Sequence, residues 1–108
     1  MKYELAKELE EAGFPQGGKG TWMYPTEAIV ARSAARMYVP PLEELIEACG
    51  EEFEQLLKVL DWSAKAPEGV KKGWEAISIH EGKWEFGLTP TEAVARLWLV
   101  LNPKHHGN

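Results

Sequence analysis

The sequence predicts a single small domain that mixes helices and strands, an α/β chain of the α+β kind. Three observations lead to this fold class. The 108 residues leave room for one core, because domains cluster near about 100–150 residues. The apolar fraction of 44% is that of a globular chain. Segments with helical apolar spacing also alternate with short β-rich segments that Gly and Pro bound, so we expect one domain at 1–102 and a polar tail at 103–108.

The first predicted element is an amphipathic helix at the N-terminus. Leu5, Ala6 and Leu9 recur at helical spacing. Gly13 supplies a left-handed cap after this helix, and Pro15 prevents its continuation. The glycine-rich residues that follow are typical of a flexible turn.

Two short strands and a helix are expected next. Residues 21–24 are rich in β-formers and predict a strand. The alanine-rich stretch 25–36 favours a helix that begins at Pro25. Residues 37–39 predict a second brief strand before a pair of prolines.

The stretch 42–60 carries a repeated helical pattern. Its apolar stripe consists of Leu42, Leu45, Ile46, Cys49, Phe53, Leu56, Leu57 and Leu60. The second half of this stripe is displaced by 11 residues from the first, which keeps the two halves nearly in phase on a helix. The stretch is therefore either one long helix or two helices joined at Gly50.

Negative charge is concentrated on this same stretch. The formal net charge is −5, and residues 40–61 hold seven acidic residues against one lysine. On a helix the glutamates would fall on the outer face. This arrangement argues against non-specific nucleic-acid binding and favours a protein partner with a basic surface. The expected partner-binding carboxylates are Glu43, Glu44, Glu47, Glu51 and Glu54.

A β-hairpin is expected at 74–80 and 83–86, around a two-residue loop. The predicted pairs are His80 with Lys83, Ile79 with Trp84, Ser78 with Glu85, and Ile77 with Phe86. The isoleucines and aromatic residues of these pairs share one face, which we expect to be the core, whereas the polar members face solvent.

The last predicted element is a helix with a clear start signal. Thr89 is a hydroxyl cap, Pro90 occupies the first helical position and Glu92 follows three residues after the cap, which together make a capping box. An apolar stripe follows, and Asn102 with Pro103 ends the helix.

Residues capable of catalysis are few. His80 and Glu85 lie on facing strands of the predicted hairpin, where a carboxylate could orient an imidazole as a general base, although no nucleophile is evident beside them. Cys49 continues an apolar stripe and is expected to be a core residue. As the single cysteine it allows no internal disulfide and no thiolate metal cluster within one chain. We expect no metal and no cofactor.

The sequence predicts neither a membrane span nor a signal peptide. No window approaches the roughly 18 consecutive apolar residues of a membrane span, and the start of the chain lacks the apolar core of a signal peptide, so we expect a cytoplasmic protein.

Three tryptophans are not assigned to the core, namely Trp22, Trp62 and Trp74. They serve either as large core side chains or as exposed anchors for a partner, and we include Trp22 and Trp62 in the expected partner-binding set.

Four segments together resemble a family of small phage and prophage proteins that have no assigned activity. They are residues 3–7 (YELAK), 12–16 (AGFPQ), 39–50 (VPPLEELIEACG) and 89–102 (TPTEAVARLWLVLN). They cover about a third of the chain in the order of the family. The resemblance implies an origin in a phage or mobile element and a location in the cytosol of a bacterial host.

A second resemblance, confined to residues 74–101, is to HicB-type antitoxins. These also place a hairpin before Gly-x-Thr-Pro-x-Glu-Ala at a helix start, as residues 87–93 (GLTPTEA) do here. The motif is largely a capping box joined to an apolar helix, which unrelated folds also produce, and no DNA-binding segment follows it.

The leading functional hypothesis is a non-enzymatic accessory protein that binds a host or defence-system protein through its acidic helix face. One alternative is a HicB-like antitoxin that neutralises a small toxin, and another is a small enzyme that uses His80 and Glu85. A homodimer is compatible with each of these hypotheses.

Overall fold

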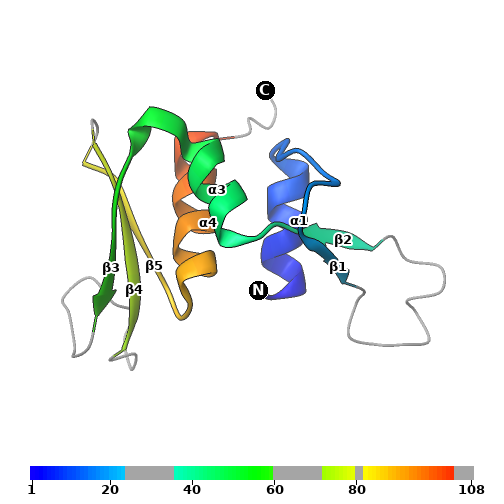
Figure 1. Cartoon of the computed structure of the whole chain (residues 1–108), viewed down its shortest axis with the longest axis horizontal. Coiled ribbons are helices and arrows are strands. Elements are labelled where there is room, and N and C mark those ends of the chain that lie inside the picture. The colour runs from blue at the N-terminus through cyan, green and yellow to red at the C-terminus, as the bar shows by residue number, and fades with distance from the viewer. Residues whose placement is uncertain (24–35, 60–71, 80–81, 104–108) are drawn as a thin grey trace.

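The fold of the chain is described from a computed structural model, which describes residues 1–23, 36–59, 72–79 and 82–103 (Figure 1). Within these ranges the structure contains three α-helices and two antiparallel sheets, so the predicted α+β class is confirmed. The elements in chain order are α1 (Tyr3–Glu11), β1 (Thr21–Met23), β2 (Met37–Val39), α3 (Leu42–Cys49), the 3-10 turn η1 (Gly50–Glu52), β3 (Phe53–Val59), β4 (Gly73–Ser78), β5 (Trp84–Gly87) and α4 (Pro90–Leu101).

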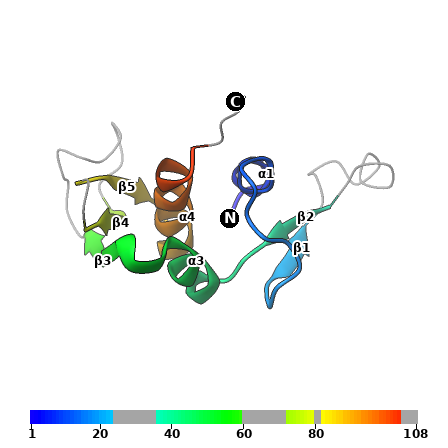
Figure 2. The same ribbon diagram turned by 90° about the horizontal axis from the view of Figure 1, so that it is seen from above.

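Helix α4 lies between the two halves of the molecule. A three-stranded sheet of order β3-β4-β5 packs on one side of it, and α1 with the β1–β2 ribbon lies on the other (Figures 1 and 2). The start of α4 confirms the first half of the predicted capping box, because the Thr89 hydroxyl oxygen accepts a hydrogen bond from the Glu92 amide at 3.1 Å. The second half differs, because the Glu92 carboxylate accepts from the Leu88 amide at 3.3 Å and not from the amide of Thr89.

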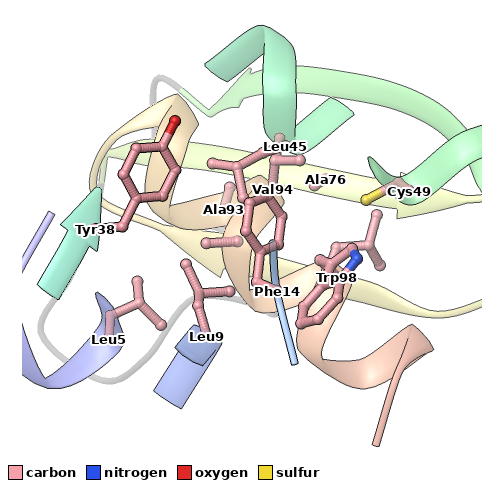
Figure 3. Packing of buried hydrophobic residues seen from close by; sticks show 12 residues of the cluster. Leu5, Leu9, Phe14, Tyr38, Leu45, Cys49, Ala76, Ala93, Val94 and Trp98 are labelled. Atoms are coloured by element: carbon pink, nitrogen blue, oxygen red, sulfur yellow. The ribbon is translucent and has the colours of Figure 1, made fainter. Parts of the chain in front are cut away.

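The core gathers around the inner face of α4 (Figure 3). Leu5 and Leu9 of α1 are buried there, as their spacing predicts, and Gly13 ends the helix turn with a φ of 96°. Phe14 then packs edge-on against Trp98 of α4, with ring centroids 5.0 Å apart. These contacts tie the N-terminal helix to the C-terminal one.

The two short strands predicted near the glycine-rich turn are present and pair with each other. Trp22 of β1 lies opposite Tyr38 of β2 in an antiparallel register. The predicted helix over 25–36 falls outside the described residues except for Arg36, which directly precedes β2. The β1–β2 ribbon lies on the α1 side of the molecule (Figure 2).

The prediction that residues 42–60 are helical is right for the first half and wrong for the second. Helix α3 ends at Gly50, whose φ of 67° suits glycine, and the chain continues as strand β3 rather than as another helix. Strand β3 has an irregular register between Phe53 and Gln55. An extra residue at such a bulge lets Phe53 and Leu56, three positions apart, both pack against the core, which imitates a helical spacing.

The predicted hairpin strands are present, but their register differs from the prediction by two residues. Ile77 pairs with Trp84, and Ala76 pairs with Glu85. Because the shift is even, the predicted grouping of side chains by face survives. The face that packs on α4 is nevertheless the one with Ser78 and Glu85, which was predicted to face solvent.

Small residues explain why this face meets α4. A Cβ atom on Gly87 would collide with the backbone of Ala93, so α4 comes close to the sheet at this point. Ala76 and Ser78 on the same face are fully buried, although Ser78 was expected to face solvent. By the strand register, Phe53, Leu56 and Trp74 lie on this same face and pack against the core beside the small residues.

Candidate protein-binding surface

Helix α3 presents two of the predicted acidic residues to solvent. Its apolar side, with Leu45 and Cys49 buried, packs on α4, so Glu43 and Glu47 project outward and are exposed. These two glutamates lie four positions apart and therefore occupy neighbouring turns of the same helix face. The expectation of an acidic helix face is met at these two positions.

Glu44 has a structural role between them. Its Oε2 atom accepts a hydrogen bond from the Lys19 amide, and its Oε1 atom accepts one from the Tyr38 hydroxyl at 2.7 Å. A Cβ atom on Gly18 would force the same carboxylate to shift, so the loop passes close to it at this point. Glu44 thus fastens the glycine-rich loop after α1 to the start of α3.

The charge of Glu44 is stabilised by these contacts. The hydrogen bond from the Lys19 amide, followed by that from the Tyr38 hydroxyl, lowers the pKa of the carboxyl below its ordinary value of 4.5. Burial, together with the hydrogen bond to Glu44, raises the pKa of Tyr38, so the phenol remains protonated and can donate. Glu44 therefore carries its negative charge at neutral pH.

The two hydrogen bonds that Glu44 accepts, from the Lys19 amide and the Tyr38 hydroxyl, are called the clamp below. Tyr38 connects this clamp to the exposed Trp22. The Tyr38 side chain is fully buried, and its hydroxyl points away from Leu5 and Leu9 in the core (Figure 3). The same hydroxyl oxygen accepts a hydrogen bond from the Gly20 amide at 2.7 Å. The Trp22 ring packs against Tyr38 with centroids 5.3 Å apart and is 39% exposed.

Arg36 completes this group on the ribbon. Its guanidinium carbon lies 4.4 Å from the centroid of the Trp22 ring, within the range of a cation–π contact. The ribbon is therefore linked to α3 by the ring contact of Trp22 with Tyr38 and the hydrogen bond of Tyr38 to Glu44. The structure brings Trp22 close to the acidic helix, which its sequence position alone did not show.

The remaining predicted carboxylates do not belong to this helix face. Glu51 lies in the 3-10 turn and Glu54 in strand β3, and both are exposed. The prediction that they continue the acidic face of a helix is wrong, because the helix stops at Gly50. Trp62 falls outside the described residues. Trp74 is half-buried on β4, where the Lys58 ammonium lies 5.8 Å from its ring centroid.

The pair proposed for catalysis is not assembled in the described residues. His80 lies outside them, and Glu85 is half-buried on the sheet face that meets α4 rather than on a solvent face. Burial raises the pKa of Glu85, and the charge of Arg96 partly opposes this rise. The site of Glu85 is therefore at the helix–sheet interface.

Cys49 is a buried core residue, as expected. Burial raises the pKa of its thiol to about 11, which disfavours the reactive thiolate. Across the described ranges, no group of three or more His, Cys, Asp or Glu side chains is arranged to hold a metal ion. No helix described here has both the length and the apolar character required to cross a bilayer.

The outer face of the three-stranded sheet is an apolar surface that the sequence analysis assigned to the core. Leu57 is 42% exposed, Ile79 is 48% exposed and Trp84 is 37% exposed. Ile77 and Phe86 are on the same side of the sheet by pairing and alternation, and Phe86 is largely buried. The prediction that this face forms the core is thus wrong for Ile79 and Trp84.

Comparison of the chain with protein-family models, curated proteins and solved structures finds no match. The resemblances to small phage proteins and to HicB-type antitoxins therefore remain predictions from sequence.

Proposed function

We propose that this chain is a non-enzymatic accessory protein that binds a basic protein through α3 and the adjacent Trp22. The observation that carries the proposal is the arrangement of α3. Glu43 and Glu47 project into solvent from adjacent turns, and Glu44 is held charged between them. Fixed carboxylates beside an exposed aromatic ring supply the charge steering and the anchor that protein interfaces use.

The chemistry of the surface indicates the class of partner. A cluster of carboxylates on one helix repels the phosphate backbone of nucleic acids and attracts lysine and arginine side chains. Arg36 stacked on Trp22 adds one positive charge at the edge of the surface, where it can pair with an acidic residue of the partner. The resemblance to phage proteins suggests a host factor or defence protein in the bacterial cytosol as that partner.

Capture of partners from a bacterial lysate, with the folded chain as bait, tests the proposal. The informative variant carries Glu43→Lys and Glu47→Lys. The control carries Glu4→Lys and Glu8→Lys, which change two exposed glutamates at the same spacing on α1 and alter the net charge equally. Mass spectrometry quantifies each captured protein, and circular dichroism checks that both variants are folded.

We expect the wild type and the α1 control to capture the same basic proteins, and the α3 variant to recover about tenfold less of them. A tenfold loss corresponds to two lost ion pairs with a combined energy of about 1.4 kcal/mol. Equal recovery by all three baits would reject the proposed surface. Equal loss with both variants would show that only net charge matters.

The HicB-like alternative remains a second proposal. It is favoured by the hairpin β4–β5 and the capping box at Thr89, which follow one another as in the antitoxin motif. In the same capture experiment it predicts one small basic toxin as the dominant protein. A purified toxin whose activity is unaffected by this chain would end that alternative.

A further inference from the structure

A hollow lies beside the clamp, between the turn after α1 and the outer side of α3. Its volume is about 390 Å³. The residues that line it are Phe14, Pro15, Gln16, Gly17, Gly18, Glu44, Glu47 and Ala48. Small-molecule sites usually span about 300–1,000 Å³, so this hollow is at the lower end of that range and has room for a long side chain.

The lining combines apolar surface with negative charge. Phe14, Pro15 and Ala48 supply apolar contacts, whereas Glu44 and Glu47 supply carboxylates. None of these lining residues is basic, and Lys19 in the adjoining loop is a positive charge that acts on Glu44. A side chain with an aliphatic stem and a cationic end matches both properties, because lysine and arginine place their stems on apolar surface and their charged ends toward polar groups.

Glu44 is prepared for such a ligand by its existing contacts. Tyr38 and the Lys19 amide hold its two oxygen atoms in place, so little side-chain entropy is lost when a cation binds. Each carboxylate oxygen has a second acceptor position, which these two hydrogen bonds leave available. Glu47, which is exposed, supplies the second carboxylate of the hollow.

We infer that this hollow receives one lysine or arginine side chain of the basic partner, between the glycine-rich loop and α3. The inference rests on the proposed function and gives the acidic surface a specific point of recognition. Glu47 is the residue that contributes to both the exposed surface and the hollow. Glu43 is exposed on the same helix but does not line the hollow.

The test is an NMR titration of the isotope-labelled full chain with three small probes. These are N-acetyl-arginine amide, N-acetyl-lysine amide and N-acetyl-citrulline amide, the last of which keeps the shape of arginine without its charge. We expect the arginine or lysine probe to shift the amides of Gly17 and Gly18 in a saturable manner. The citrulline probe should bind at least about threefold more weakly, as for the loss of one exposed ion pair.

The variants identify the residues responsible. Glu47→Gln should weaken the binding of the cationic probe by about threefold to fivefold. Glu4→Gln, at an exposed position of α1 outside both the hollow and the proposed surface, should leave it unchanged. Equal shifts with citrulline, equal effects of the two substitutions, or no shift at Gly17 and Gly18 would each overturn the inference. Glu44→Gln is not used here, because it would also release the loop.

The two proposals can fail independently. If the α3 double variant loses the captured partner but Glu47→Gln does not affect probe binding, the acidic surface is supported and the hollow is rejected. If the cationic probe binds in the hollow but the double variant still captures the same proteins, the hollow is a site for a cationic side chain, but the proposed function and the assignment of that side chain to the partner are rejected.

Discussion

Removal of the Tyr38 hydroxyl is the sharpest test of how the binding surface is held in place. Tyr38→Phe keeps the buried ring but deletes the oxygen that accepts from the Gly20 amide and donates to Glu44. One of the two hydrogen bonds is neutral and the other involves a charged acceptor. Loss of the hydroxyl from a fully buried side chain should therefore cost about 2 kcal/mol of unfolding free energy, within a range of about 1–3 kcal/mol.

The measurement is urea unfolding of the wild type and the variant, with thermal unfolding as a second readout. A loss of about 2 kcal/mol corresponds to a fall in the melting temperature of about 10 °C in a chain of this length. Because the substitution leaves the core packing unchanged, the dependence of unfolding free energy on urea concentration should not change.

A double-mutant cycle with Glu44→Gln separates the clamp from other effects of the hydroxyl. Since Tyr38 donates to Glu44, the cost of Tyr38→Phe should be smaller in the Glu44→Gln background than in the wild type. Equal costs in both backgrounds would show that the two side chains are not energetically coupled. A cost of Tyr38→Phe below about 0.5 kcal/mol would refute the reasoning altogether.

Three further predictions concern the acid limb of stability, the cysteine and the sheet. The pKa of Glu44 is lowered in the folded state, so its stabilising effect is present above its ordinary pKa of 4.5 and is lost as the pH falls through the folded value. The difference in unfolding free energy between the wild type and Glu44→Gln should therefore shrink from about pH 6 to about pH 3. A constant difference over this range would contradict the prediction. With a pKa of about 11 and a buried position, the Cys49 thiol should react with a disulfide reagent at neutral pH only after unfolding in urea, and rapid stoichiometric reaction of the native chain would disprove its burial. The exposed outer face of the sheet offers on the order of 300 Å² of apolar surface, against about 800 Å² per partner in a standard interface, so any homodimer built on it should be weak. Ile79→Lys should abolish concentration-dependent association in sedimentation experiments and Leu88→Lys, at an exposed position in the turn before α4, should not; equal behaviour of the two variants would exclude this face.

Local signals in the sequence predicted those elements that local chemistry determines. The capping box at Thr89 fixed the start of α4, and the apolar spacing of Leu42, Leu45 and Cys49 predicted α3. Two of the predicted binding residues, Glu43 and Glu47, are exposed on that helix as expected. In these cases the deciding contacts lie within a few residues of one another.

The errors arose where distant contacts decide the outcome. The bulge in β3 gives Phe53 and Leu56 a helix-like spacing, so periodicity alone could not identify a strand. Where α4 approaches most closely, the inner face of the sheet carries small residues such as Ala76, so the large hairpin residues Ile79 and Trp84 lie on the outer face although the sequence pattern predicted them to be core. The clamp of Glu44 on the Lys19 amide joins residues 25 positions apart, and the sequence contains no local signal for it.

The most direct test of the proposed binding surface is a map of the backbone amides that a captured basic partner perturbs. NMR spectra of the labelled chain with and without the purified partner would provide that map. The proposal predicts that the changes concentrate on α3 around Glu43 and Glu47, on the glycine-rich loop and at Trp22. Changes confined to the outer face of β3, β4 and β5, with α3 unaffected, would contradict it.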